Sequence, residues 1–266
     1  MWIRETSEKE PKGVFVIVHG AGEYHVRYEW VVQQLNRSGY HVIIGDLPGQ
    51  GTTTGRRGHV SEFPEYFRQV RPWLREARGY GLPVIQLGHS MGGLISLLVQ
   101  NEIKPSLRPD ILVLSSPCLG LANTPPIYKR AISRVLNQVW PTLSLPSGLE
   151  PGSGTRDEKM RARDRADASL VKKVSVRYYR ELTASIRRAH EEASLFPDLP
   201  LFVMQGGDDR IVDKEEVKRW FNALDITDKA YREWPGYFHE VLNDPGKEEV
   251  LLQMLAFVTA RLHMVK

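Results

Sequence analysis

Short apolar runs alternate with longer amphipathic stretches along the first 115 residues of the chain. Four runs have the length and β-branched content of strands buried on both faces: 14–18, 41–44, 84–87 and 111–114. Between them lie three stretches with the length of helices: 28–38, 64–78 and 90–101. Residues 2–6 are expected to add an edge strand. Strict alternation of strand and helix predicts a parallel sheet with helices on both faces.

The alternation stops after residue 117. Residues 118–198 contain no comparable strand run, but the apolar positions between Ile127 and Trp140 recur every four residues and predict a helix with one apolar face. The βα pattern then resumes with strands and helices at 201–204, 214–223, 230–234 and 247–262. We therefore expect an α/β core of residues 1–117 and 199–266, interrupted by a mostly helical cap of residues 118–198.

Composition excludes several classes of protein. The chain has 266 residues, a net charge of +4 and one cysteine, Cys118, which excludes an internal disulfide framework and cysteine-rich zinc sites. The longest apolar runs are far shorter than the roughly 20 residues of a membrane helix. The N-terminal residues lack the apolar segment of a signal peptide. We expect a soluble, cytoplasmic protein.

The excess positive charge is concentrated in one segment. Residues 156–192 contain eleven basic and seven acidic residues, so this segment has a net charge of +4, the same as that of the whole chain. Such a segment is either a solvated helical face or a surface for anionic partners, such as phospholipid head groups or nucleic acid. The basic and aromatic run at 177–180 is explained better by an amphipathic helix, so no nucleic-acid partner is expected.

Residues 88–92, Gly-His-Ser-Met-Gly, carry the most specific chemical signal. They fit G-x-S-x-G and lie directly after a predicted strand and before a predicted helix. In that position the turn is strained and presents the serine oxygen at the carboxyl edge of the sheet, where ligands of open α/β sheets bind. The pattern alone occurs by chance, but this position makes Ser90 a candidate nucleophile rather than a helix N-cap.

A nucleophilic serine needs a base and an acid that orients the base. His239 is the only histidine that follows a late strand, so we assign it as the base. Asp208 and Asp209 both follow the strand at 201–204, and spacing alone does not choose between them. The developing oxyanion needs two backbone N–H donors, one from Met91 and one from the loop at 19–22. No metal or nucleotide motif follows a strand, so we expect no metal and no cofactor.

Four motifs together resemble the monoacylglycerol lipase and lysophospholipase branch of the α/β-hydrolases, which belongs to the serine aminopeptidase-like hydrolases: 19–23 (His-Gly-Ala-Gly-Glu), 55–60 (Gly-Arg-Arg-Gly-His-Val), 88–93 and 205–210. The resemblance covers essentially the whole chain. It implies the α/β-hydrolase fold, a mostly parallel sheet with a helical cap inserted after the sixth strand of the full fold. It also implies that the acid is Asp209, and that the oxyanion donors are Ala21 and Met91.

The expected function is that of a serine carboxylic-ester hydrolase acting through an acyl-Ser90 intermediate. The substrate would be a fatty acyl ester of a glycerol-type alcohol, either a lysophospholipid or phospholipid or a monoacylglycerol. Where this branch often has His-Ser and Gly-His-Gly, the chain has Tyr24-His25 and Gly49-Gln50-Gly51, so head-group preference is not carried over. The apolar face of 127–140 would pack on the main domain or form an acyl wall.

Two other functions and one binding partner are also considered. An aminopeptidase of the same superfamily would need acidic side chains near the site, which the basic cap does not offer. A non-catalytic ligand-binding protein on this fold would not need an intact triad. The basic segment 156–192 would allow transient contact with an anionic membrane surface and a peripheral location.

Overall fold

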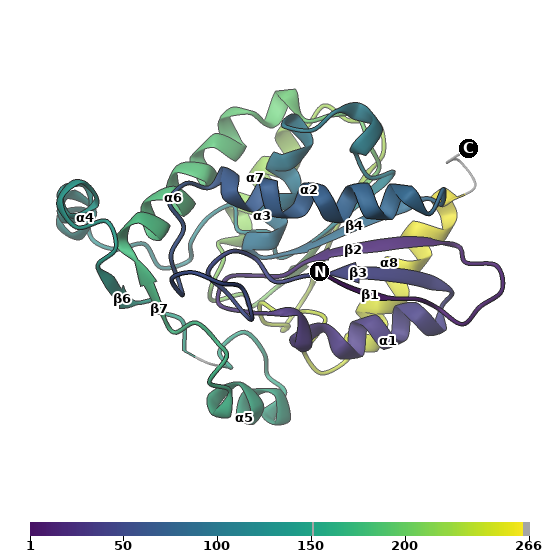
Figure 1. Cartoon of the computed structure of the whole chain (residues 1–266), viewed down its shortest axis with the longest axis horizontal. Helices are drawn as coiled ribbons and strands as arrows, with labels where there is room; N and C mark the ends of the chain where they lie inside the picture. Colours follow the sequence, from purple (N-terminus) through teal and green to yellow (C-terminus); the bar gives the residue numbers. More distant parts are fainter. Residues whose placement is uncertain (151, 263–266) are drawn as a thin grey trace.

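The computed structural model describes residues 1–150 and 152–262. Within these residues a seven-stranded sheet has the order β1-β3-β2-β4-β5-β8-β9, and only β1 pairs antiparallel (Figure 1). The strands are β1 (Trp2–Arg4), β2 (Gly13–Val18), β3 (Tyr40–Ile44), β4 (Val84–His89), β5 (Ile111–Ser115), β8 (Leu201–Gly206) and β9 (Lys229–Trp234). The prediction of a mostly parallel sheet is confirmed.

Helices cover both faces of the sheet, which explains the uninterrupted apolar runs. Along β2, Val14 and Val16 join one buried cluster, whereas Phe15 and Ile17 join the other. The first cluster includes residues of α2 (Pro64–Gly79), α3 (Met91–Leu98) and α7 (Lys214–Ala223). The second includes residues of α1 (Glu29–Arg37) and α8 (Lys247–Leu262). Short 3-10 turns are η1 (His25–Tyr28), η2 (Val99–Asn101), η3 (Pro105–Leu107) and η4 (Ala193–Leu195).

The chain leaves the sheet between β5 and β8. This excursion contains α4 (Ile127–Val139), β6 (Ser144–Pro146), α5 (Glu158–Ala166), β7 (Lys173–Ser175) and α6 (Val176–Glu191). It follows the fifth strand of this sheet, one strand earlier than in the expected count of the full fold. The antiparallel pair β6–β7 was not predicted, because strands of three residues leave no pattern in the sequence. Figure 1 places α4 and α5 away from the sheet, at the left and the bottom of the view.

Two helices of the excursion behave differently. Helix α6 buries Tyr178 and Leu182 in the same cluster as α3, so it covers the core. Helix α4 has the predicted apolar face, but Ile127 is 80% and Val139 is 73% exposed. The expectation that this face packs on the main domain is wrong, because α4 contacts α6 through its other side, where Arg177 Nε donates to Asn137 Oδ1 at 2.7 Å. None of the described helices has the length and apolar composition needed to cross a membrane.

Candidate active site

Ser90 lies in a strained turn between β4 and α3. Its backbone has φ 52° and ψ −120°, a conformation that residues other than glycine rarely adopt. The turn requires small neighbours, since a Cβ added at Gly88 would lie 2.6 Å from the carbonyl oxygen of Gly92, and one at Gly92 would collide with the carbonyl of Val18. The sequence therefore holds the serine oxygen at the carboxyl edge of the sheet.

Asp209 and His239 come from the ends of β8 and β9 and meet beside this turn. Asp209 Oδ2 lies 2.7 Å from His239 Nδ1, and both side chains are almost completely buried. Burial favours the neutral carboxyl, but the charge of His239 and two backbone N–H donors hold the pKa of Asp209 below its ordinary value. Asp208, in contrast, is exposed. Of the two candidates that spacing left open, the structure brings only Asp209 to the histidine.

The backbone N–H groups of Ala21 and Met91 are the candidate donors to an oxyanion. Among the described residues neither makes a hydrogen bond, whereas the neighbouring groups of the same loop are held in place. Gly20 N–H donates to Glu23 Oε2 at 2.7 Å, and Gly22 N–H donates to Gln50 Oε1 at 2.5 Å. The fixed loop leaves the Ala21 N–H free, and the Met91 N–H is free at the start of α3; an oxyanion site requires two such donors.

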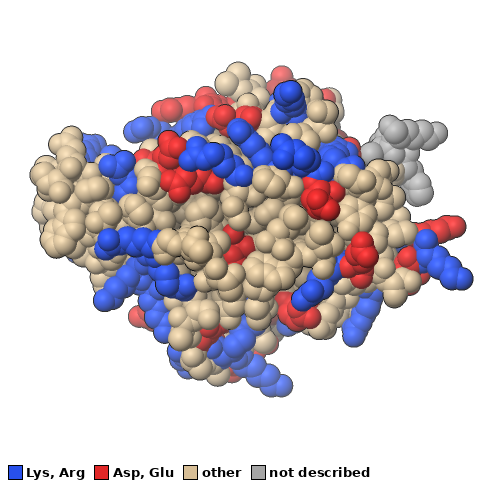
Figure 2. All heavy atoms as spheres, in the orientation of Figure 1, with Lys and Arg blue, Asp and Glu red and all other residues tan. Residues whose placement is uncertain are grey.

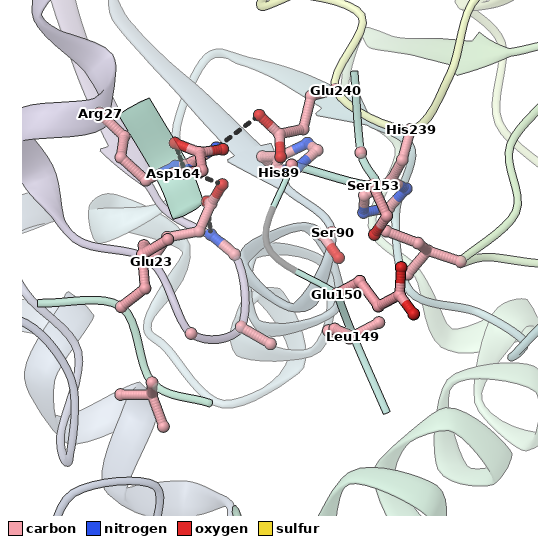
Figure 3. Close-up of a pocket in the computed structure, with 18 of the residues that line it drawn as sticks. Glu23, Arg27, His89, Ser90, Leu149, Glu150, Ser153, Asp164, His239 and Glu240 are labelled. Carbon is pink, nitrogen blue, oxygen red and sulfur yellow. Dashed lines mark hydrogen bonds and ion pairs between the residues drawn. The ribbon is translucent and has the colours of Figure 1, made fainter. Parts of the chain in front are cut away.

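A cavity of about 80 Å³ connects these groups. Ser90, His239 and Ala21 line it, together with apolar side chains from Leu149, Leu170, Val171 and Ile211. Figure 3 shows Ser90 and His239 among the side chains around this cavity. In the described structure Ser90 Oγ makes no hydrogen bond with His239, a common state of catalytic pairs without substrate.

An ionic cluster that the sequence analysis missed forms another wall of the cavity. Arg27 contacts three carboxylates, with N···O distances of 3.2 Å to Glu23, 2.6 Å to Asp164 and 2.6 Å to Glu240. Burial opposes the charge on Glu23, but Arg27 and its neighbours lower the pKa of this carboxyl to about 2. The spacing of Glu23 and Arg27 could have suggested an ion pair, but nothing in the sequence links them to Asp164.

This cluster corrects one inference from charge. The cap was expected to offer no acidic side chains near the site, because residues 156–192 are basic overall. Asp164 from α5 nevertheless lines the cavity with its side chain 1% exposed, and Glu150 lines its mouth. The net charge of a segment counts every charged side chain, and it does not report which of them point inwards.

Ser116 is a further residue that the sequence analysis missed. It follows β5 with φ 42°, and its hydroxyl donates to the carbonyl oxygen of His239 at 2.8 Å. Ser116 thus fixes the backbone of the histidine loop against the sheet. A serine after a strand is too common in sequences to have signalled this role. Among the described residues no cluster of histidine, cysteine, aspartate or glutamate has the arrangement of a metal site.

Comparisons with known proteins agree with this geometry. The model of a hydrolase family described as serine aminopeptidase, S33, matches residues 9–246. The chain is 47% identical to the phospholipase YtpA of Bacillus subtilis over 93% of this chain and 95% of that protein. It is 27% identical to a monoacylglycerol lipase of Mycolicibacterium smegmatis over 97% and 91%. The solved structure of Paleococcus ferrophilus monoacylglycerol lipase superposes with a TM-score of 0.87, at 29% identity and 97% coverage of both chains.

Proposed function

The chain belongs to the hydrolase family described as serine aminopeptidase, S33, and we propose that it hydrolyses carboxylic esters of fatty acids through an acyl-Ser90 intermediate. One observation carries the proposal: the strained Ser90 and His239 line one cavity, and Asp209 holds His239 from behind at 2.7 Å. A receptor without catalysis has no need for a serine held in this conformation.

The proposed reaction has two halves. In the first half His239 takes the proton of Ser90 as the oxygen attacks the ester carbonyl, and the N–H groups of Ala21 and Met91 stabilise the oxyanion. His239 then gives the proton to the leaving alcohol as the C–O bond breaks. In the second half a water molecule attacks the acyl-serine, with His239 again as base and then as acid. Asp209 holds the imidazole in the required tautomer and stabilises its cation.

The proposed substrate is a fatty acyl ester of a glycerol-type alcohol. The names of the relatives, a phospholipase and a monoacylglycerol lipase, support this class. Apolar side chains of the cavity, including Leu149 and Ile211, offer contacts to an acyl chain. The expected acyl wall from 127–140 is not part of this proposal, because no residue of α4 lines the described cavity.

We also propose that the excursion from the sheet is a cap of residues 118–198 on a core of 1–117 and 199–266, and that it contacts anionic membrane surfaces. The exposed apolar face of α4 supports this, because an amphipathic helix of this kind lies in a membrane interface. Figure 2 shows an end of the molecule with few charges over α4, bordered by lysine and arginine side chains. Association with the membrane would be peripheral.

A panel of p-nitrophenyl esters of increasing chain length tests the activity. We expect hydrolysis by the wild type and none by Ser90→Ala, whose thermal unfolding should be nearly unchanged because only a hydroxyl is removed. A serine-directed organophosphonate should label one site in the wild type. An aminoacyl-anilide serves as the peptidase control. Equal labelling of Ser90→Ala, or cleavage of the anilide alone, would contradict the proposal.

A further inference from the structure

The loop after β3 contacts residues 19–22, which we call the oxyanion loop, through a buried side chain. Gln50 is 2% exposed, and its Oε1 accepts the N–H of Gly22 at 2.5 Å. Only the oxygen of an amide group can accept, so this contact fixes the orientation of the amide. Gln50 is not among the residues that line the described cavity. It therefore contacts the oxyanion loop without reaching the place of the substrate.

Packing alone does not explain an amide at this position. The Nε2 of Gln50 is a buried donor with no partner among the described residues. A buried donor without a partner destabilises a fold, and an apolar side chain of similar size would avoid that cost. What the amide adds is the acceptor for Gly22. The backbone of Gln50 is itself held, because its N–H donates to Leu47 O at 3.0 Å and its carbonyl accepts the hydroxyl of Thr53 at 2.6 Å.

Gly22 is the point at which the oxyanion loop can change conformation most easily. Ala21 and Gly22 form a turn, and Gly22 has φ 78°. The two commonest β-turns differ by a flip of the peptide unit between their central residues, and a glycine at the second of these is compatible with both. A flip here would turn the Gly22 N–H away from Gln50 and rotate the backbone of Ala21. The next peptide unit is already held, because Val171 N–H donates to the Gly22 carbonyl at 3.0 Å.

The peptide unit that carries the Ala21 N–H is held by the same loop after β3. Burial lowers the pKa of His19, and its Nε2 accepts the N–H of Leu47 at 2.9 Å. The neutral ring therefore has its proton on Nδ1, which donates to the carbonyl oxygen of Gly20 at 2.8 Å. The peptide units on both sides of Ala21 are thus held, one by His19 and the other by Gln50.

Resting on the proposed ester hydrolysis, we infer that Gln50 is a positioning residue, which keeps the Ala21 N–H directed at the developing oxyanion through its bond to Gly22. An oxyanion donor contributes most when it is oriented before the reaction, because no reorganisation is then needed as the charge forms. Loss of one such donor typically lowers kcat by about 10²–10³. Loosening a donor that can still return to its place should cost less, about tenfold.

Two substitutions of similar length separate the acceptor of Gln50 from the bulk of its side chain. Gln50→Met lacks the amide oxygen, whereas Gln50→Glu keeps an acceptor oxygen in either protonation state. For p-nitrophenyl butyrate we expect Gln50→Met to lower kcat and kcat/KM equally, by about tenfold, because the oxyanion forms only in the transition state. Gln50→Glu should stay within about threefold of the wild type, because the bond to Gly22 can still form.

Inhibition gives a readout that a merely structural role would not change. A short alkyl trifluoromethyl ketone adds to Ser90 and places an oxyanion at the two donors, whereas an alcohol of the same chain length occupies the cavity without one. In Gln50→Met the Ki of the ketone should rise by about tenfold, and the Ki of the alcohol should not change. Gln69→Met is the matched control, because Gln69 Nε2 donates to the Asp46 carbonyl of the same loop after β3, at 3.2 Å, and not to the oxyanion loop. Its kcat/KM and both Ki values should equal those of the wild type.

The same assays separate two kinds of failure. If the wild type does not hydrolyse p-nitrophenyl butyrate, the proposed function fails. If it does, the positioning role is overturned when Gln50→Met keeps the kcat/KM and the ketone Ki of the wild type, or when the Ki of the alcohol rises as much as that of the ketone. Equal losses in Gln50→Glu or Gln69→Met overturn it as well.

A shorter amide is the substitute if Gln50→Met does not fold. Gln50→Asn keeps the polar group but lacks one methylene, so its oxygen does not reach the N–H of Gly22. We expect the same losses in kcat/KM and in the ketone Ki as for Gln50→Met. Values of both equal to those of the wild type would overturn the positioning role.

Discussion

Asp208 and Asp209 are neighbours in the chain, but they differ in the bonds they make. Asp209 contacts His239 and accepts from two backbone N–H groups, while the side chain of Asp208 is exposed. We expect Asp209→Asn to lower kcat for p-nitrophenyl butyrate by several orders of magnitude, because the amide favours the wrong histidine tautomer; about 10⁴ is known for a serine protease. Asp208→Asn should cost less than tenfold. The reverse order would show that the acid is assigned to the wrong residue.

The environment of His239 also sets the pH dependence. Burial lowers the pKa of this imidazole, but the charge and hydrogen bond of Asp209, and further the charge of Glu240, raise it above the ordinary 6.5. A base must be neutral, so kcat/KM should fall as the pH drops through this raised pKa. Glu240→Gln removes one raising charge and should move the acidic limb of a pH–rate profile to lower pH. An unmoved limb would show that Glu240 does not act on His239.

At the scale of elements, α4 is where the expectation from sequence and the structure differ most. Its apolar periodicity predicted the helix correctly, because periodicity reports local geometry. What an apolar face contacts depends on the position of the helix, which the periodicity does not contain. The strands β6 and β7 escaped prediction for a related reason, since each is fixed by pairing with the other across the excursion. Long buried strands such as β2 and β4 were found because burial on both faces makes each a continuous apolar run.

The exposed face of α4 leads to a prediction about membranes. Sedimentation with phosphatidylglycerol vesicles should be strong at low salt and weaker at 0.5 M, since the Debye length shrinks from ~10 Å at 0.1 M to ~3 Å at 1 M. Replacing Val135 and Val139, 60% and 73% exposed, by aspartate should reduce binding to any vesicle. Lys172→Glu with Lys173→Glu should reduce binding only to anionic vesicles.

Leu252→Asp supplies the control for this element. Leu252 is also an exposed apolar residue, at 68%, but it lies on α8 rather than on the excursion. Its replacement should leave vesicle binding unchanged. Loss of binding in Leu252→Asp equal to that in the α4 variants would mean that general surface hydrophobicity, and not α4, drives the association.

At the scale of the whole molecule, the sequence predicted the features that depend on chain order and missed those that depend on packing. Ser90, His239 and the pair Asp208 and Asp209 were singled out because each follows a strand, and parallel strands bring their carboxyl ends to one edge. The choice of Asp209 over Asp208 came from the family resemblance and not from this order. The contact between Arg27 and Asp164 joins α5 of the excursion to the core, across more than a hundred residues. Such a contact depends on how the excursion folds back over the sheet, which neither motif nor charge count encodes.

The Arg27 cluster should also make the stability of the whole fold depend on acid. The folded-state pKa of Glu23 is about 2 against 4.5 for the free group, so its charge stabilises the fold above pH 4.5, and this contribution is lost as the pH falls towards 2. The shift corresponds to about 3 kcal/mol for this almost fully buried side chain. Glu23→Gln should therefore unfold at lower temperature than the wild type at pH 6, and the difference in Tm should narrow below pH 4.5. Glu62→Gln is the control, because the Glu62 side chain is 55% exposed, and its Tm should equal that of the wild type at both pH values. A Tm difference between Glu23→Gln and the wild type that stays constant down to pH 3 would contradict the lowered pKa of Glu23.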